Sequence, residues 1–176
     1  MPAVRQKIDQ EVKKVAGDGL IVYQEETAKI DGALRKLLKG SEAKCALLVD
    51  KDGHLITRQG FTHSLDTTAL AALLAGSFAS TKEIARLVGE PEFSVLFHQG
   101  KRDHIHMSLI NERTILVVIF DDRTTIGMVR LYSKETAEEL NQIFELALSK
   151  KGADDDGLSD DFADSAESKL DDIFQD

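Results

Sequence analysis

Residues 65–80 read Leu-Asp-Thr-Thr-Ala-Leu-Ala-Ala-Leu-Leu-Ala-Gly-Ser-Phe-Ala-Ser, and Asp66 is the only charged residue among them. Asp66 can cap the N-terminus of a helix that we expect to end at Gly89, with Pro91 reinforcing the stop. A surface helix needs one apolar stripe and a polar back. Four large apolar residues here are suited to face a core, namely Leu70, Leu73, Leu74 and Phe78. Several of the other positions hold small residues where a surface helix would have polar ones: Ala72, Ala75, Gly76 and Ala79.

These small residues leave two interpretations open. The first is an internal helix packed tightly within its own domain. The second is a helix covered on one side by its own sheet and on the other by a second subunit or a partner, because small side chains let another backbone approach closely. A membrane span is excluded by length, since Lys82, Glu83 and Arg86 follow at once. A chain of this size has few layers with which to bury such a helix, which favours the second interpretation.

Five strands are predicted around this helix. Residues 45–49 and 114–120 are continuous apolar runs, typical of strands buried on both faces. The other three alternate between their two faces and are separated by short turns: 54–59, 93–98 and 104–109. One helix over 20–38 precedes the strands and another follows residues 121–125. We therefore expect an α/β (α+β) three-layer sandwich in the order helix-strand-strand-helix-strand-strand-strand-helix, with a five-stranded, mostly antiparallel sheet between helices.

The 176-residue chain carries a net charge of −9 that is unevenly placed. Residues 151–176 hold ten acidic and two basic residues, a net −8, so residues 1–150 carry only −1. Neither part offers the basic patch that attracts nucleic acid. Cys45 is the only cysteine, so no disulfide forms within the chain, and a reducing cytoplasm fits best. The N-terminus lacks the apolar core of a signal peptide.

The chain divides into three predicted parts: an N-terminal extension over 1–19 that is disordered or a short helix, a domain over 20–150, and an acidic linker with an amphipathic segment over 151–176. In the last part, Leu170, Ile173 and Phe174 fall at helical spacing, with Phe162 upstream. A tail that served only solubility would not need these residues. Amphipathic segments of this kind dock in a partner's groove. A frayed helix that packs loosely on its own domain is the alternative, and the sequence weighs the two equally.

No catalytic constellation is recognisable in the sequence, which lacks a P-loop and a nucleophile elbow. His104 and His106 lie two residues apart on a predicted strand, so both side chains point to one face, with Asp103 and His98 as the nearest further ligands. A zinc site needs a third and usually a fourth ligand, and most such pairs are simply the polar face of an outer strand. We therefore expect no metal, no cofactor and no active site in this chain.

Short motifs spread along the chain carry a family resemblance. They are LLVDKDGHLI over 47–56, LDTT over 65–68, AGS over 75–77, LVGE over 87–90, FHQG over 97–100, VVIFD over 117–121, LSDD over 158–161 and DDIF over 171–174. In this order they resemble the Roadblock (dynein light chain) superfamily, and most closely its bacterial members that act on a small Ras-like GTPase of the MglA type. The resemblance spans 20–176 and leaves 1–19 outside.

This resemblance implies a homodimer whose second helices lie side by side and whose sheets join edge to edge. Two copies of the chain would bind one GTPase on the paired helices and accelerate GTP hydrolysis, as regulators of cell polarity or motility. They would push the GTPase's own Arg and Gln into place without donating an arginine. A Roadblock scaffold that leaves GTP turnover unchanged is the alternative, since a fold alone fixes no function.

The same resemblance assigns residues to two partner-binding surfaces. The GTPase-binding surface maps onto Ala72, Ala75, Gly76, Ala79 and Glu83. Glu83 departs from the family, whose motility members tend to be small at that position. The C-terminal segment would bind the GTPase away from the nucleotide and tune its affinity or exchange, with these anchors: Phe162, Leu170, Ile173 and Phe174.

Overall fold

The computed structural model describes residues 12–14 and 21–173, with side chains for residues 26–149. The described elements are β1 (Val12–Lys14), β2 (Ile21–Tyr23), α2 (Gln24–Ser41), β3 (Cys45–Asp50), β4 (Leu55–Gly60), α3 (Thr67–Val88), β5 (Val95–Gln99), β6 (His104–Asn111), β7 (Thr114–Phe120) and α4 (Ile126–Ile173). From α2 onward, the predicted order of helices and strands is confirmed. None of the described helices combines the length and apolar character that crossing a membrane requires.

The main sheet has five strands in the order β4-β3-β7-β6-β5, and every neighbouring pair is antiparallel. The two strands predicted to be buried on both faces, β3 and β7, pair with each other at the centre of the sheet, with Leu47 opposite Val117. All of β7 and nearly all of β3 are buried. The continuous apolar runs therefore reflect a central position between two covering layers.

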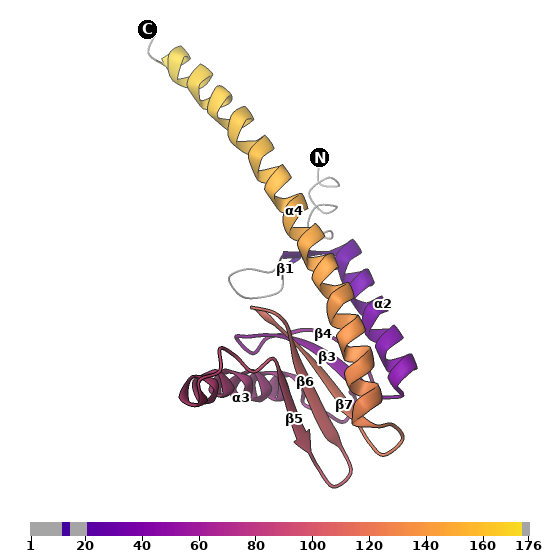
Figure 1. Cartoon of the computed structure of the whole chain (residues 1–176). Helices are drawn as coiled ribbons and strands as arrows, with labels where there is room; N and C mark the ends of the chain where they lie inside the picture. The colour runs from indigo at the N-terminus through magenta and orange to yellow at the C-terminus, as the bar shows by residue number, and fades with distance from the viewer. Residues whose placement is uncertain (1–11, 15–20, 174–176) are drawn as a thin grey trace. The chain divides into compact units, whose positions relative to one another are not determined.

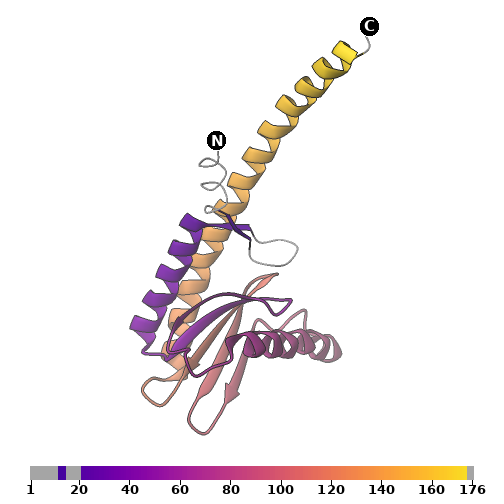
Figure 2. The same ribbon diagram turned by 180° about the vertical axis from the view of Figure 1, so that it is seen from behind.

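Helices cover both faces of this sheet, with α3 on one side and α2 and the first turns of α4 on the other (Figures 1 and 2). Side chains alternate along a strand, so neighbouring residues serve different layers. The α3 side holds a cluster of buried residues that includes Leu47, Val117 and Met107 from the sheet together with Leu74 and Phe78 from the helix. The opposite face buries the alternate residues of the central strands against α2: Ala46, Leu48, Leu116, Val118 and Phe120. The three-layer arrangement is thus confirmed.

Helix α3 begins and ends where its sequence predicts. The Asp66 carboxylate accepts a hydrogen bond of 3.0 Å from the backbone N–H of Ala69, which satisfies one of the free donors at the N-terminus. Gly89 adopts a left-handed conformation with φ of 80°, and its N–H donates to the carbonyl of Arg86. Both ends of the helix are therefore set by local residues.

Near both ends of the chain the described secondary structure differs from the one expected from the sequence. Val12–Lys14 forms a strand that pairs antiparallel with Ile21–Tyr23, within the extension expected to be disordered or helical. Residues 1–11 and 15–20 lie outside the described part. Helix α4 continues as far as Ile173, through the Asp-Asp-Asp-Gly stretch over 154–157 that was expected to form a linker. The chain divides into compact units Met1–Ile143 and Phe144–Asp176, and the geometry below concerns the first. The predicted domain boundary at residue 150 stays a prediction.

Replacing Gly60 with alanine should destabilise the domain by about 2 kcal/mol. Gly60 ends β4 opposite Cys45 and has φ of +88°, where a side chain is strained. An added Cβ would also meet the carbonyl oxygen of Lys44 and lie 2.9 Å from Cys45 Cα. Urea denaturation measures the loss. Gly32→Ala is the control: the α2 backbone is helical there and an added Cβ meets nothing within 4 Å, so a gain of about 1 kcal/mol is expected. Equal stability changes in the two variants would contradict this account.

Candidate functional site

The outward face of α3 is the candidate site, because only the opposite face of this helix packs on the sheet. Its buried residues recur at helical spacing and pack on the sheet: Thr67, Ala71, Leu74, Ala75, Phe78, Thr81 and Ala85. The remaining residues are mostly exposed although many are apolar. The second interpretation of the sequence, a helix with one face left for another molecule, agrees with this burial pattern.

Four of the five predicted GTPase-binding residues lie on the exposed side of α3. Ala72, Gly76, Ala79 and Glu83 follow one another at spacings of four, three and four, so they form one row along the helix. We call these four residues the small-residue stripe. An added Cβ at Gly76 would meet nothing within 4 Å, so the stripe is open to an approaching backbone.

Ala75, the fifth predicted residue, lies in the core. It is only 3% exposed and belongs to the cluster between α3 and the sheet. The physical reason is its spacing, since Ala75 comes four residues after Ala71 and three before Phe78, both of them buried. Its small side chain serves packing on the sheet, and it does not reach the stripe's outer surface.

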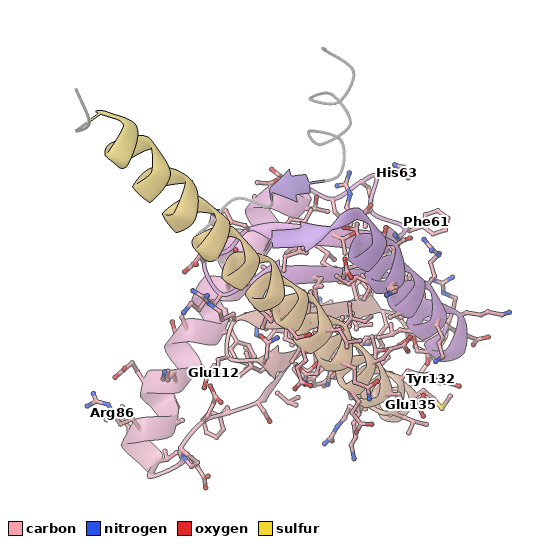
Figure 3. The ribbon with its side chains drawn as sticks, turned by 90° about the horizontal axis from the view of Figure 1, so that it is seen from above. Phe61, His63, Arg86, Glu112, Tyr132 and Glu135 are labelled. Carbon is pink, nitrogen blue, oxygen red and sulfur yellow. The ribbon has the colours of Figure 1, made fainter. Side chains whose placement is uncertain are left out.

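Intramolecular contacts account for part of the stripe's composition. The turn between β3 and β4 approaches the helix closely, because a Cβ built on Gly53 would lie 2.9 Å from Ala72 Cα. At the other end, Glu83 forms an exposed ion pair of 2.9 Å with Arg86. Arg86 projects outward from α3 (Figure 3). Glu83 therefore adds a charge that is already paired within the helix.

A second row of exposed residues on α3 is bulky and apolar. Leu73 and Leu87 are 72% and 80% exposed, and Ile84 is 51% exposed. They lie eleven and three residues apart, which places them on one face about four turns long. We call these three residues the apolar row. Leu73 was expected in the core, and that expectation is wrong, because the neighbouring Leu74 occupies the core position.

Strand β5 offers another surface, since it lies at the edge of the sheet and no other described strand pairs with its outer side. Val95 and Phe97 are 43% and 39% exposed on this strand. An edge strand presents unpaired backbone groups that can pair with another chain. The free edge and the apolar row both suit a protein partner.

The histidines and the cysteine do not form a metal or nucleophile site within the described residues. No group of three or more His, Cys, Asp or Glu side chains in that part of the chain could hold a metal. His104 Nε2 lies 3.6 Å from the Asp122 carboxylate, whereas His106 is buried. Burial raises the pKa of the Cys45 thiol to about 11, which keeps it protonated and unreactive.

The predicted tail anchors cannot be placed with their side chains. Phe162, Leu170 and Ile173 belong to the part of helix α4 beyond residue 149, where only the backbone is described. Phe174 lies outside the described residues. Their role in binding a partner stays a prediction.

The chain is similar to a known domain family and to several solved structures. The Roadblock/LC7 domain family matches residues 29–120, more than half of the chain. The structure of Myxococcus xanthus MglB is 46% identical with a TM-score of 0.64, with 66% of this chain and 95% of that chain covered. The gliding protein MglB of Thermus thermophilus is 29% identical with a TM-score of 0.69, covering 74% and 98%. A structure described as MglB with tetrameric arrangement is 30% identical with a TM-score of 0.71, covering 75% and 99%.

The family match runs through all five strands of the main sheet and the whole of α3, which carries the candidate site. The same elements in the same order were expected from the sequence motifs. The chain therefore belongs to the Roadblock/LC7 family and lies near its MglB members.

Proposed function

We propose that this protein is a homodimeric regulator that activates a small Ras-like GTPase of the MglA type, in bacterial cell polarity or motility. The observation that carries the proposal is the exposed face of α3, where the small-residue stripe runs beside the apolar row. Such a face is built to bind protein surfaces. The chain itself contributes no recognised catalytic motif, so the chemistry belongs to the GTPase.

The apolar row supports the homodimer. Exposed apolar patches of this kind mark protein interfaces, because burying them releases free energy. In a dimer with α3 against α3, each copy would cover the other's Leu73, Ile84 and Leu87. The free edge of β5 would at the same time allow the two sheets to join, as the family resemblance implies.

The small-residue stripe supports the binding of a GTPase on the paired helices. Ala72, Gly76 and Ala79 let the partner's backbone approach α3 closely, and Ala75 holds the helix on the sheet from beneath. Activation then requires only that the dimer bind the hydrolysis-competent conformation more tightly than the resting one. The arginine of α3, Arg86, is engaged by Glu83, in keeping with activation through the GTPase's own Arg and Gln.

Single-turnover GTP hydrolysis by the co-encoded Ras-like GTPase, with and without this protein, tests the proposal. A hundredfold acceleration corresponds to about 3 kcal/mol of barrier lowering and would establish an activating protein. Binding without acceleration would identify the alternative, a Roadblock scaffold that does not affect turnover. Absence of binding would exclude regulation of this GTPase and leave only a scaffold for other proteins.

We also propose that residues 151–176 form a separate partner-binding segment, with anchors at Phe162, Leu170, Ile173 and Phe174. Removing residues 158–176 should weaken the complex with the GTPase about tenfold, equivalent to about 1.4 kcal/mol. Titration of the labelled GTPase measures this loss, and light scattering of the truncated protein should still give a dimer. A truncated chain that binds and stimulates as well as the full chain would show that the segment has another role.

A further inference from the structure

A cavity of about 470 Å³ lies between strands β5 and β6 and the first turns of α4. Seven of the residues that line it carry the argument: Val95, His106, Ser108, Arg130, Leu131, Ser133 and Lys134. It opens on the face of the sheet opposite α3, because His106 and Ser108 alternate with Met107, which belongs to the α3-side cluster. The volume is within the range of small-molecule sites.

Three polar side chains in the cavity are buried and have no hydrogen-bond partner among the side chains and backbone that the structure describes. His106 is 2% exposed, and neither of its ring nitrogens is paired. The hydroxyls of Ser108 and Ser133 are likewise unpaired, at 9% and 1% exposure of their residues. Buried polar groups normally find a partner, because an unpaired one costs about 1–3 kcal/mol. These three groups are therefore available to a ligand.

The charges around the cavity have one sign. Arg130 and Lys134 line it four residues apart on α4, and no carboxylate is among the lining residues. Within residues 26–149 neither cation is engaged in an ion pair. Val95 and Leu131 form the apolar part of the remaining wall. The cavity thus combines an apolar wall, neutral hydrogen-bonding groups and two cations.

We propose that this cavity binds a small molecule with one anionic group on an apolar body. Arg130 and Lys134 hold the anion, a carboxylate or a phosphate monoester, and the Ser133 hydroxyl donates a hydrogen bond to the bound molecule. The apolar body lies against Val95 and Leu131. His106 and Ser108 complete the polar part of the wall. This site lies on the other face of the sheet from the stripe and does not depend on the proposed GTPase function.

The test titrates the full-length chain with octanoate, octyl phosphate and octanol, followed by NMR of the backbone amides of β5, β6 and α4. We expect saturable shifts at His106 and Ser108 with both anions and at least tenfold weaker binding of octanol. Whichever of octanoate and octyl phosphate binds more tightly identifies the anionic group that the cavity prefers. Equal binding of octanol, or no saturable shift at these residues, would overturn the proposal.

Two matched double variants test whether the cations of the cavity bind the anions. The double variant Arg130→Gln with Lys134→Gln should bind octanoate and octyl phosphate at least tenfold more weakly. Both residues are exposed, so the fold should tolerate the change. Arg35→Gln with Lys39→Gln removes an exposed Arg and Lys at the same spacing on α2 and should leave binding unchanged. Equal weakening in the two double variants would mean that only net charge attracts the ligand, which contradicts a built site.

Discussion

Ala79→Arg should abolish the acceleration of GTP hydrolysis while leaving the dimer folded. Ala79 is exposed in the middle of the small-residue stripe, between Gly76 and Glu83. An arginine there would place a long, hydrated cation where the partner's backbone must approach α3 closely. We expect at least a hundredfold loss of affinity for the GTPase, equivalent to about 3 kcal/mol, measured by titration of the GTPase in its triphosphate state.

The matched control is Ala28→Arg, which introduces the same side chain at an exposed position of α2 on the other face of the sheet. This variant should bind and stimulate like the parent. Light scattering should report the same mass for both variants, so that a loss of binding is not confused with a loss of the dimer. Full affinity in Ala79→Arg would show that the GTPase docks on a different face.

The fold could be predicted because its main signals are local. The apolar runs over 45–49 and 114–120 require cover on both faces, and they became the central strands β3 and β7. Asp66 and Gly89 bound α3 through hydrogen bonds to its own backbone. Short turns between alternating segments leave antiparallel pairing as the simplest topology. None of these arguments needs knowledge of distant contacts.

The orientation of α3 could not be predicted fully, because periodicity gives a spacing but not its phase. Leu73 and Leu74 are adjacent and equally apolar, yet Leu73 is 72% exposed and Leu74 is 5% exposed. Packing against Leu47 and Val117 decides between them. The same packing takes Ala75 into the core. The recurrence of 71, 74, 78, 81 and 85 at helical spacing was the signal available in the sequence.

His104 and His106 show a second limit of sequence reasoning. Their spacing places both on one face of β6, but their surroundings come from other elements. His104 lies near Phe97 and Phe120, with ring centroids 6.2 and 5.2 Å away. His106 lines the cavity beneath α4. The approach of a helix some 25 residues further along the chain is a tertiary fact that two histidines in a strand do not reveal.

His106 should make the domain less stable in acid by about 3 kcal/mol. Burial, with a smaller contribution from the nearby positive charge of Arg130, lowers the pKa of His106 to about 4 from its ordinary 6.5. Between these values the unfolded chain binds a proton at this residue that the folded chain does not, so stability rises with pH. Above pH 6.5 His106 is neutral in both states and costs the fold nothing by protonation. As the pH falls from 6.5 toward 4, the free energy of unfolding decreases because only the unfolded chain takes up the proton. Each pH unit in that window is worth about 1.4 kcal/mol.

His106→Leu isolates this effect from the titration of the carboxylates, which both proteins share. Urea denaturation of the parent and the variant at half-unit steps from pH 4 to pH 7 gives two stability curves. Their difference should change by about 3 kcal/mol across the window and stay level above pH 6.5, because a leucine cannot take up a proton. Lys134 is the other charged residue that lines the same cavity. Carboxylate and phosphate buffers are to be avoided, since an anion in the cavity would favour the protonated imidazole and narrow the window. Parallel curves would mean that His106 is already solvated or paired in the folded protein, and the cavity would then lack the unpaired imidazole that makes it a ligand site.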